Sequence, residues 1–420
     1  MTKNVPEIRF KGFSCEWDEN NLGELIDVGS AARVHKEQWT QEGVPFFRTS
    51  DVVSFYKGKK NKEVFISHEL YQELSEKIGK VTSGDLLITG GGTIGIPYLV
   101  TNEDPLYFKD ADLLWLKNNQ KLDGNFLYTF FFSLSFKKHI KSISHIGTIG
   151  HYTISQAKST PISTCERNEQ TQIGNYFQKL ERLISQQQQK YDKLRNIKKA
   201  MLEKMFPKLG ETVPEIRFEG FREDWDEIKF TEIFDAKDGI RRGPFGSAIK
   251  KDMFVPVSNY VVYEQQNAIY DKYETRYNIT KQKYHELISF KVVPGDFIMS
   301  GAGTIGRISR VPEGVAPGVF NQALIRMKIN EKNIDSEYFL QWIRSEEMQN
   351  RLTEANPASA MVNLVPMSEL KGWDILIPKK EEQGQIGNYF QKLDVLINQH
   401  QQKITKLKNI KQACLTKMFV

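Results

Sequence analysis

An internal duplication constrains the fold of this 420-residue chain more than any other feature of its sequence. Three motifs occur twice and in the same order, namely VPEIRFKGF at Val5–Phe13 and VPEIRFEGF at Val213–Phe221, GDLLITGGGTIG from Gly84 and GDFIMSGAGTIG from Gly295, and QIGNYFQKL from Gln172 and again from Gln385. The period is about 210 residues, whereas solenoids repeat every 20 to 50 residues or so. The duplication therefore predicts two copies of one plan with pseudo-twofold symmetry.

Between these motifs the two halves differ. GSAARVHKEQWTQEGVPFFRTSDVV, which starts at Gly29, has little likeness to DGIRRGPFGSAIKKDMFVPVSNYVV, which starts at Asp238. A repeated frame with divergent contents indicates a shared scaffold that carries two different surfaces. The composition of 40% apolar and 11% aromatic residues is sufficient for hydrophobic cores, and it excludes a wholly disordered chain.

The end of each half predicts a long helix with one apolar seam. The seam alternates in steps of four and three, at Ile173, Phe177, Leu180, Ile184, Tyr191, Leu194, Met201 and Met205 and at Ile386, Phe390, Leu393, Ile397, Ile404, Leu407, Cys414 and Met418. Polar residues interrupt it at Gln187, Lys198, His400 and Lys411. About 35 residues make a rod of roughly 50 Å, too long to bury against a small domain. We expect the two helices to pair as an antiparallel intramolecular coiled coil, and Pro207 and Gly210 to end the first.

The beginning of each half predicts a mixed globule. The runs DLLIT, DFIMS, VFIS and YNIT are strand-like, and Ser67 and Thr280 stand as N-caps before the helix-like HELYQELSEK and KQKYHELI. The fold class is therefore α+β, with two mixed α/β globules alternating with two long helices. We place the globules at residues 1–157 and 210–371 and the helical segments at 158–209 and 372–420.

Charge is unevenly distributed along the chain. The formal net charge is +6, but the helical segments are strongly basic and the remainder is slightly acidic. A polyanionic partner would be attracted to the helices, and the globules would need local basic clusters to bind it. The alternative is that these Lys and Arg side chains only form solvated outer faces.

Several classes of protein are disfavoured. The longest strongly apolar stretch, Tyr128–Phe136, is far too short to span a membrane, and the first ten residues contain no apolar signal core. Cys15, Cys165 and Cys414 lie far apart, so neither a disulfide framework nor a thiolate zinc site is indicated. We expect a soluble, cytoplasmic protein.

Two glycine-rich stretches match the G-x-G-x-x-G pattern of cofactor-binding loops. They comprise Gly90, Gly92 and Gly95 and, in the second half, Gly301, Gly303 and Gly306. That pattern holds a dinucleotide only where the last glycine opens a helix, and here it is followed by IPYLVTNEDP and RISRVPEGVAP, which are β-branched or contain proline. We interpret both stretches as glycine turns inside a sheet.

Other motifs with catalytic associations are incomplete. Asp104-Pro105-Leu106-Tyr107 resembles the D/N-P-P-Y/F motif of adenine-N6 methyltransferases, but it lacks the second proline and has no counterpart in the second half, so we predict a surface turn. His139, His145 and His151 form no complete metal spacing, and there is no G-x-x-x-x-G-K-[ST] phosphate loop. We propose no metal and no cofactor in this chain. These absences favour a recognition protein.

The duplicated arrangement resembles the specificity subunit of type I restriction-modification systems over essentially the whole chain. The resemblance depends on E-Q-x-Q-I-G-N-Y-F-Q-K-L at Glu169–Leu180 and Glu382–Leu393, on the duplicated G-D-[LF]-[LI]-[IM]-[TS]-G-[GA]-G-T-I-G motif, and on G-P-F-G-S at Gly243–Ser247. The first globule departs from the family pattern because it lacks G-P-F-G-S.

The resemblance implies that each globule is a target recognition domain that reads one half of a bipartite duplex DNA site. The paired helices would set the half-site spacing and dock two methyltransferase subunits that use S-adenosylmethionine to methylate adenine N6. Restriction subunits would add ATP- and Mg-dependent translocation and cleavage. This chain would have no catalytic activity of its own.

Residues that would contact DNA follow from local charge and from the divergent segments. In the second globule we predict Arg241, Arg242, Lys250 and Lys251, which bracket the GPFGS turn, with Asn259 and Tyr260 as candidates for base edges. In the first globule the analogous predictions are Arg33, Lys36, Arg48, Thr49 and Ser50, with Lys57, Lys59 and Lys60 on phosphates. The loops at residues 144–153 and 355–363 are further candidates. For each residue the alternative is a solvated surface group.

Two other functions stay open at this point. One is a pseudosymmetric coiled-coil adaptor that organises partner proteins without reading DNA. The other is an enzyme that holds a nucleotide cofactor on its glycine-rich turns. Salt-dependent duplex binding would distinguish the DNA-binding function from the adaptor, since neutralised phosphates release counterions.

Overall fold

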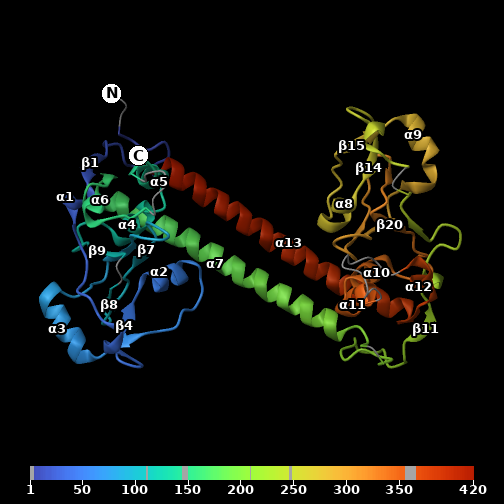
Figure 1. Ribbon diagram of the computed structural model, residues 1–420, viewed down its shortest axis with the longest axis horizontal. Coiled ribbons are helices and arrows are strands. Elements are labelled where there is room, and N and C mark those ends of the chain that lie inside the picture. Colours follow the sequence, from blue (N-terminus) through green and yellow to red (C-terminus); the bar gives the residue numbers. More distant parts are fainter. Residues whose placement is uncertain (1–3, 110–111, 144–149, 209, 246–247, 355–365) are drawn as a thin grey trace. The chain divides into compact units, whose positions relative to one another are not determined.

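The computed structural model describes residues 4–109, 112–143, 150–208, 210–245, 248–354 and 366–420. It divides into two compact units, which we call the first unit (Met1–Gln189 with Gln401–Val420) and the second unit (Lys190–His400). Each unit therefore contains one globule and parts of both long helices (Figure 1).

The first unit contains two four-stranded sheets and a two-stranded ribbon. One sheet has the order β2(Asp27–Gly29), β9(Leu113–Lys117), β6(Leu86–Thr89), β7(Pro97–Leu99), and all its pairs are antiparallel. The other has the order β3(Trp39–Thr40), β5(Phe65–Ile66), β4(Val44–Phe47), β8(Tyr107–Phe108), in which β4 and β8 run parallel. The ribbon pairs β1(Asp18–Asn21) with β10(Pro161–Thr164), directly before the long helix.

The first unit also contains short helical elements and the start of a long helix. They are α1(Leu22–Leu25), the 3-10 turn η1(Lys36–Gln38), α2(Thr49–Tyr56), α3(His68–Ile78), α4(Gly124–Phe130), α5(Leu134–Ile143), α6(Ile154–Lys158) and the long α7(Arg167–Lys204), which continues into the second unit. Ser67 caps α3 by accepting a hydrogen bond from the backbone N–H of Leu70, as the sequence predicts.

The second unit repeats this plan with one additional strand. Its sheets have the orders β12(Ile240–Arg242), β20(Leu324–Met327), β17(Phe297–Ser300), β18(Ile308–Arg310) and β13(Phe254–Val255), β15(Tyr277–Ile279), β14(Tyr260–Tyr263), β19(Gly318–Phe320), β16(Lys291–Val292). The ribbon pairs β11(Asp226–Lys229) with β21(Asp374–Ile377). The strand order of the duplicated sheets is thus the same in both units.

The helical elements of the second unit are distributed along its chain as follows. They are η2(Phe230–Ile233), η3(Lys251–Met253), α8(Gln265–Tyr270), α9(Lys281–Glu286), η4(Ile288–Phe290), α10(Ser336–Ile343), α11(Glu346–Glu354), α12(Met367–Gly372) and the long α13(Lys380–Lys417). Thr280 caps α9 as predicted, with its side chain accepting from the N–H of Lys283. The predicted strands DLLIT, DFIMS, VFIS and YNIT are confirmed as β6, β17, β5 and β15.

Within each unit the segments of α7 and α13 run antiparallel and share the core of the globule. In the first unit Tyr176 contacts Cys414 and Glu181 pairs with Lys411. Residue numbers therefore increase along α7 in the direction in which they decrease along α13. The core there joins Phe126 of α4 to Phe177 of α7 and to Phe419 after α13.

The second unit has the equivalent core. Phe206, just after α7, stacks on Phe390 of α13 and lies against Tyr338 of α10. Residues of the apolar seam predicted from the sequence therefore also complete the globules, since Ile173, Phe177 and Leu180 pack in the first core and Ile386, Phe390 and Leu393 pack in the second.

Two of the four predicted polar interruptions of the seam, Lys198 and Lys411, form ion pairs between the two helices. Lys198 lies 2.6 Å from Asp394 in the second unit, and Lys411 pairs with Glu181 in the first. Burial lowers the pKa of Lys198 although Asp394 favours its charged form. A polar partner required at one seam position fixes the register of a helix pair, because any other register leaves a charge in the seam unpaired.

Candidate nucleic-acid interface

The duplicated motifs meet at a joint between globule and helices, and this joint occurs once in each unit. In the first unit Arg9 of VPEIRF donates two hydrogen bonds, of 2.6 and 2.7 Å, to the carboxylate of Glu169 in the first turn of α7. In the second unit Arg217 donates two, of 2.7 and 2.8 Å, to Glu382 in the first turn of α13. Both carboxylates are buried, with exposures of 0% and 1%. The hydrogen bond to its glutamate raises the pKa of each arginine.

The same segment also closes the end of the opposing helix. The N–H of Ile8 donates a 3.0 Å hydrogen bond to the carbonyl of Lys417, and Glu7 pairs with the Lys417 ammonium at 2.8 Å. In the second unit the N–H of Ile216 donates to the carbonyl of Lys204 at 2.9 Å. A helix leaves its last carbonyls without partners, so these amides act as C-caps. We call the segments Glu7–Arg9 and Glu215–Arg217 the staples, because each fastens the start of one long helix to the end of the other.

The duplicated E-Q-x-Q-I-G-N-Y-F motif seats a short helix of the globule on the long helix. The side chain of Gln170 accepts from the N–H of Asp123, the N-cap of α4, and the side chain of Gln383 accepts from the N–H of Asp335, the N-cap of α10. A Cβ on Gly174 would lie 2.7 Å from an Asp123 carboxylate oxygen. The glycine is therefore required by the close contact between the two helices.

The two glycine-rich stretches are hairpin turns, as predicted. One connects β6 to β7 and the other connects β17 to β18, so a strand follows each last glycine instead of a helix. Gly95 and Gly306 have φ values of 77° and 75°, a conformation that L side chains rarely adopt. Neither turn presents the helix N-terminus that a cofactor phosphate would need.

The other motifs singled out in the sequence lie in structural contacts. Asp104 lies in an exposed bend, as the predicted surface turn requires, and Tyr107 is buried in β8. His151 lies 3.1 Å from an oxygen of Asp112, His139 lies near Thr160, and residue 145 is outside the described residues. Among the described residues, no group of three or more His, Cys, Asp or Glu could hold a metal ion.

The predicted DNA contacts of the first unit collect around α2 and the loops beside it. Lys57, Lys59 and Lys60 are exposed in the loop after α2, and Lys59 and Lys60 line a cavity of about 380 Å³ together with the aromatic side chains of β4 and β5. Thr49 and Ser50 form the first turn of α2. Arg33 and Lys36 are exposed in the preceding connection, Arg33 after β2 and Lys36 in η1.

Arg48 differs from these residues because its guanidinium binds within the protein. It donates to both oxygens of Asp51, at 2.7 and 3.0 Å, and to the carbonyl of Lys62 at 2.7 Å, and it lies over the ring of Trp39. The structure thus uses Arg48 to join the start of α2 to the lysine loop that follows the helix.

The predicted contacts of the second unit lie on β12, on the segment that follows it and at the start of β14. Arg242, Lys250 and Lys251 are exposed, and Asn259 is exposed before β14. Tyr260, in β14, lies against Tyr284 with a ring separation of 4.6 Å. Of the candidate loop at residues 144–153, residues 144–149 lie outside the described residues, Tyr152 is buried and Thr153 is the N-cap of α6, and the candidate loop at 355–363 lies wholly outside the described residues.

Arg241 belongs to a charge network that the sequence did not reveal. Asp238 accepts from Arg241 at 3.2 Å and also pairs with Arg326, which is 1% exposed. Burial favours the neutral form of Asp238, but the hydrogen bonds from Arg326 and Arg241 outweigh it and lower the pKa of Asp238. Arg241 is therefore held in place beside the exposed Arg242. The spacing of three residues between Asp238 and Arg241 was the available sequence signal.

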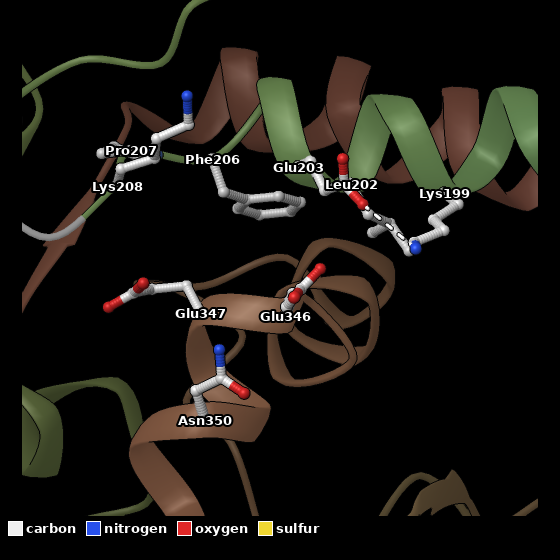
Figure 2. A pocket seen from close by; sticks show the side chains of 9 residues that line it. All are labelled: Lys199, Leu202, Glu203, Phe206, Pro207, Lys208, Glu346, Glu347 and Asn350. Atoms are coloured by element: carbon white, nitrogen blue, oxygen red, sulfur yellow. Dashed lines mark ion pairs between the residues drawn. The ribbon is translucent and has the colours of Figure 1, made fainter. Parts of the chain in front are cut away.

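A separate hollow of about 430 Å³ lies at the joint of the second unit (Figure 2). Phe206 lies between the last turns of α7 and the start of α11, where Glu346 and Glu347 face it. Lys199 and Glu203 form an ion pair of 3.7 Å along its edge. Its lining is of mixed charge, in contrast to the basic loops described above.

Comparison with known proteins identifies the family. The model of the type I restriction modification DNA specificity domain matches twice, over residues 15–196 and 222–409. The chain belongs to this family. The two matches cover both copies of the internal duplication, so each half is a specificity domain of this type.

Individual relatives agree with this assignment. A Haemophilus influenzae protein named for the specificity subunit of a type I restriction enzyme is 31% identical over 194 residues, or 42% of this chain and 47% of the relative. The chain thus spans about half the length of that curated relative. The solved type I restriction-modification S subunit from M. genitalium has the same fold, with a TM-score of 0.61, 16% identity and coverage of 99% of both chains.

A second solved structure shares the fold. It comes from a study of complex assembly and conformational transition of a type I R-M system, and it covers 95% of this chain and 96% of its own, with a TM-score of 0.54 and 16% identity. In the part of the chain that the structure describes, no helix is both long and apolar enough to cross a membrane.

Proposed function

We propose that this chain is the DNA-binding specificity subunit of a type I restriction-modification complex, and that each globule reads one half of a bipartite target. The observation that carries the proposal is the double match to the DNA specificity domain, one match per half. The division of labour within the sequence supports it, because the identical residues form the joints and the divergent residues form exposed basic loops.

The proposed domains follow the boundaries expected from the sequence. Residues 1–157 and 210–371 are the target recognition domains, and residues 158–209 and 372–420 are the spacer helices. The helices set the distance between half-sites and dock two methyltransferase subunits. The chain itself catalyses nothing and works in the cytoplasm.

Chemistry belongs to the partner subunits in this proposal. The methyltransferase subunits use S-adenosylmethionine to methylate adenine N6, and restriction subunits use ATP and Mg for translocation and cleavage. A target adenine must leave the base stack to be methylated, and the flipped base enters the methyltransferase. The specificity subunit then needs only to bind the duplex on either side.

The proposed DNA contacts are the residues predicted from the sequence. They are Arg33, Lys36, Arg48, Thr49, Ser50, Lys57, Lys59 and Lys60 in the first globule and Arg241, Arg242, Lys250, Lys251, Asn259 and Tyr260 in the second. The exposed lysines would neutralise phosphates, which fixes the register of the protein on the duplex, while base-edge contacts provide the sequence preference.

Co-expression with a candidate methyltransferase partner, followed by mapping of N6-methyladenine across the host DNA, tests the proposal. We expect a single bipartite motif that disappears when this chain is deleted. Methylation that persists unchanged without the chain would instead favour a coiled-coil adaptor that reads no DNA.

A further inference from the structure

Phe245 is the most exposed phenylalanine among the described residues of the second unit. Phe245 is 91% exposed, whereas the phenylalanines of the neighbouring strands β17 and β19 are completely buried. Binding to a partner that removes an apolar ring of this size from water lowers the free energy. Phe245 belongs to the G-P-F-G-S motif, to which the proposed function so far gives no role.

The base of the loop holds Phe245 in a defined position. The N–H of Gly243 donates a 2.9 Å hydrogen bond to the carbonyl of Leu324 in β20, and a Cβ at position 243 would lie 1.9 Å from the carbonyl oxygen of Asn321. Pro244 is buried, and the carbonyl of Phe245 accepts a 2.8 Å hydrogen bond from the N–H of Ala248. The glycine and proline of the motif thus attach the loop to the sheet, and its phenylalanine points outward.

The charges that flank Phe245 along the chain suit a polyanion. Arg242 precedes the loop, Lys250 and Lys251 follow it, and all three are exposed. Arg241 stays oriented by Asp238 and the buried Arg326. An aromatic ring flanked by cations is the arrangement by which proteins combine base stacking with phosphate contacts.

The first unit has an exposed basic side chain in the corresponding connection. Gly29 of β2 pairs with Trp115, and Arg241 of β12 pairs with Arg326, at corresponding positions of the two sheets. Arg33 follows Gly29 in the connection to η1 and is exposed, and this connection is three residues shorter than the one from Arg241 to η3 that contains Phe245. The connection is shared while its length and side chains differ, as expected for a segment that helps to read two different half-sites.

We propose that Phe245 is a stacking residue that inserts against a base step of the half-site read by the second globule. Proteins that insert an apolar side chain between bases unstack a base step. The free-energy cost of unstacking is offset because the distorted duplex contacts more of the protein surface. This inference rests on the proposed function. It adds a contact of shape and stacking to the charged contacts predicted from the sequence.

The test uses the full chain in complex with its methyltransferase and a duplex that carries the mapped motif. 2-Aminopurine is the probe, because the fluorescence of this base analogue rises when it unstacks. It replaces each adenine of the duplex in turn, except the adenine that is methylated. We expect the wild-type complex to raise the fluorescence at one step of one half-site. Phe245→Ala should abolish that rise and weaken binding by about 10-fold, and Phe245→Trp should retain both.

Tyr270→Ala is the matched control, since Tyr270 is an aromatic residue of the same unit that is 68% exposed. It should leave the fluorescence and the affinity unchanged. The inference is overturned if Phe245→Ala keeps the fluorescence rise and binds within twofold of wild type, or if Tyr270→Ala causes the same loss. A wild-type complex that binds no duplex selectively would contradict the proposed function itself, and the inference with it.

Discussion

Removing the arginine of one staple should destabilise the unit that contains it. The carboxylate of Glu169 is fully buried and accepts both of its short hydrogen bonds from Arg9, which is only 11% exposed. Arg9→Met keeps most of the apolar stem but leaves this carboxylate buried without its cation. Breaking a buried pair from one side costs about 3–5 kcal/mol, a large part of the roughly 5–15 kcal/mol that stabilise a typical domain.

Urea unfolding measures this effect, because urea does not screen charges. With a slope of about 2 kcal/mol per M, the transition of the first unit should move down by roughly 2 M. Hydrogen exchange read by mass spectrometry assigns the loss to a unit, since peptides from the start of α7 and the end of α13 report on the first joint. Arg217→Met should produce the same loss at Glu382 in the second unit.

Two controls separate the buried charge from other causes. Lys77→Met removes a surface ion pair with Glu73, in which the side chains are 60% and 62% exposed, and it should cost less than about 0.5 kcal/mol. Arg9→Met combined with Glu169→Leu removes both charges and should recover much of the stability, because an apolar pair avoids the desolvation of an unpaired ion. The reasoning is refuted if Arg9→Met costs no more than Lys77→Met, or if the double variant is no better than the single one.

Three further predictions concern packing, charge and acid. Gly387→Ala should cost about 1–3 kcal/mol in thermal unfolding, because its Cβ would lie 2.8 Å from the backbone nitrogen of Tyr338, whereas Gly384→Ala in the same helix meets nothing within 4 Å and should be neutral or slightly stabilising. Replacing Lys59 and Lys60 with alanine should reduce the slope of log affinity against log salt by about 2 in duplex binding, while Lys77→Ala should leave it unchanged. Asp238→Asn should lower the Tm at neutral pH, because the pKa of the Asp238 carboxyl is lower in the folded protein than in the unfolded chain. Such a carboxylate stabilises the fold at pH values above the pKa of the unfolded chain. This contribution is lost as the pH falls through the pKa of the folded protein. The gap in Tm between wild type and Asp238→Asn should therefore close below about pH 4, and a gap that is constant between pH 7 and pH 3 would contradict this assignment.

Local features of the fold and the antiparallel pairing of the long helices were predictable from the sequence, whereas the pairing of strands far apart in the chain was not. Ser67 and Thr280 cap the helices expected after them, and the glycine turns are hairpins, because a few neighbouring residues decide such features. The strand order was not predictable, since β2 pairs with β9 across more than half of the globule and no local pattern specifies that partner. The contact of Gly174 with Asp123 was hidden for the same reason.

The candidate site was predicted from charge, and charge alone does not separate residues that bind a ligand from residues that hold the protein together. Arg48 and Arg241 were selected with the lysines, but each has an acid three residues away that engages its guanidinium. Phe245 was passed over because it carries no charge, although its exposure makes it the least expected side chain of its loop.

The repeated motifs and the divergent loops of this chain differ in whether buried contacts depend on their side chains. A buried ion pair such as Arg9–Glu169 tolerates no change on one side alone, so the residues of each joint are fixed by contacts that both units need. An exposed loop position such as Arg33 carries no such constraint from folding, because solvent accepts almost any side chain there. A scaffold divided in this way can change what it reads without changing how it folds. Divergence between the halves is therefore expected in the loops that follow β2 and β12, and identity is expected in the staples.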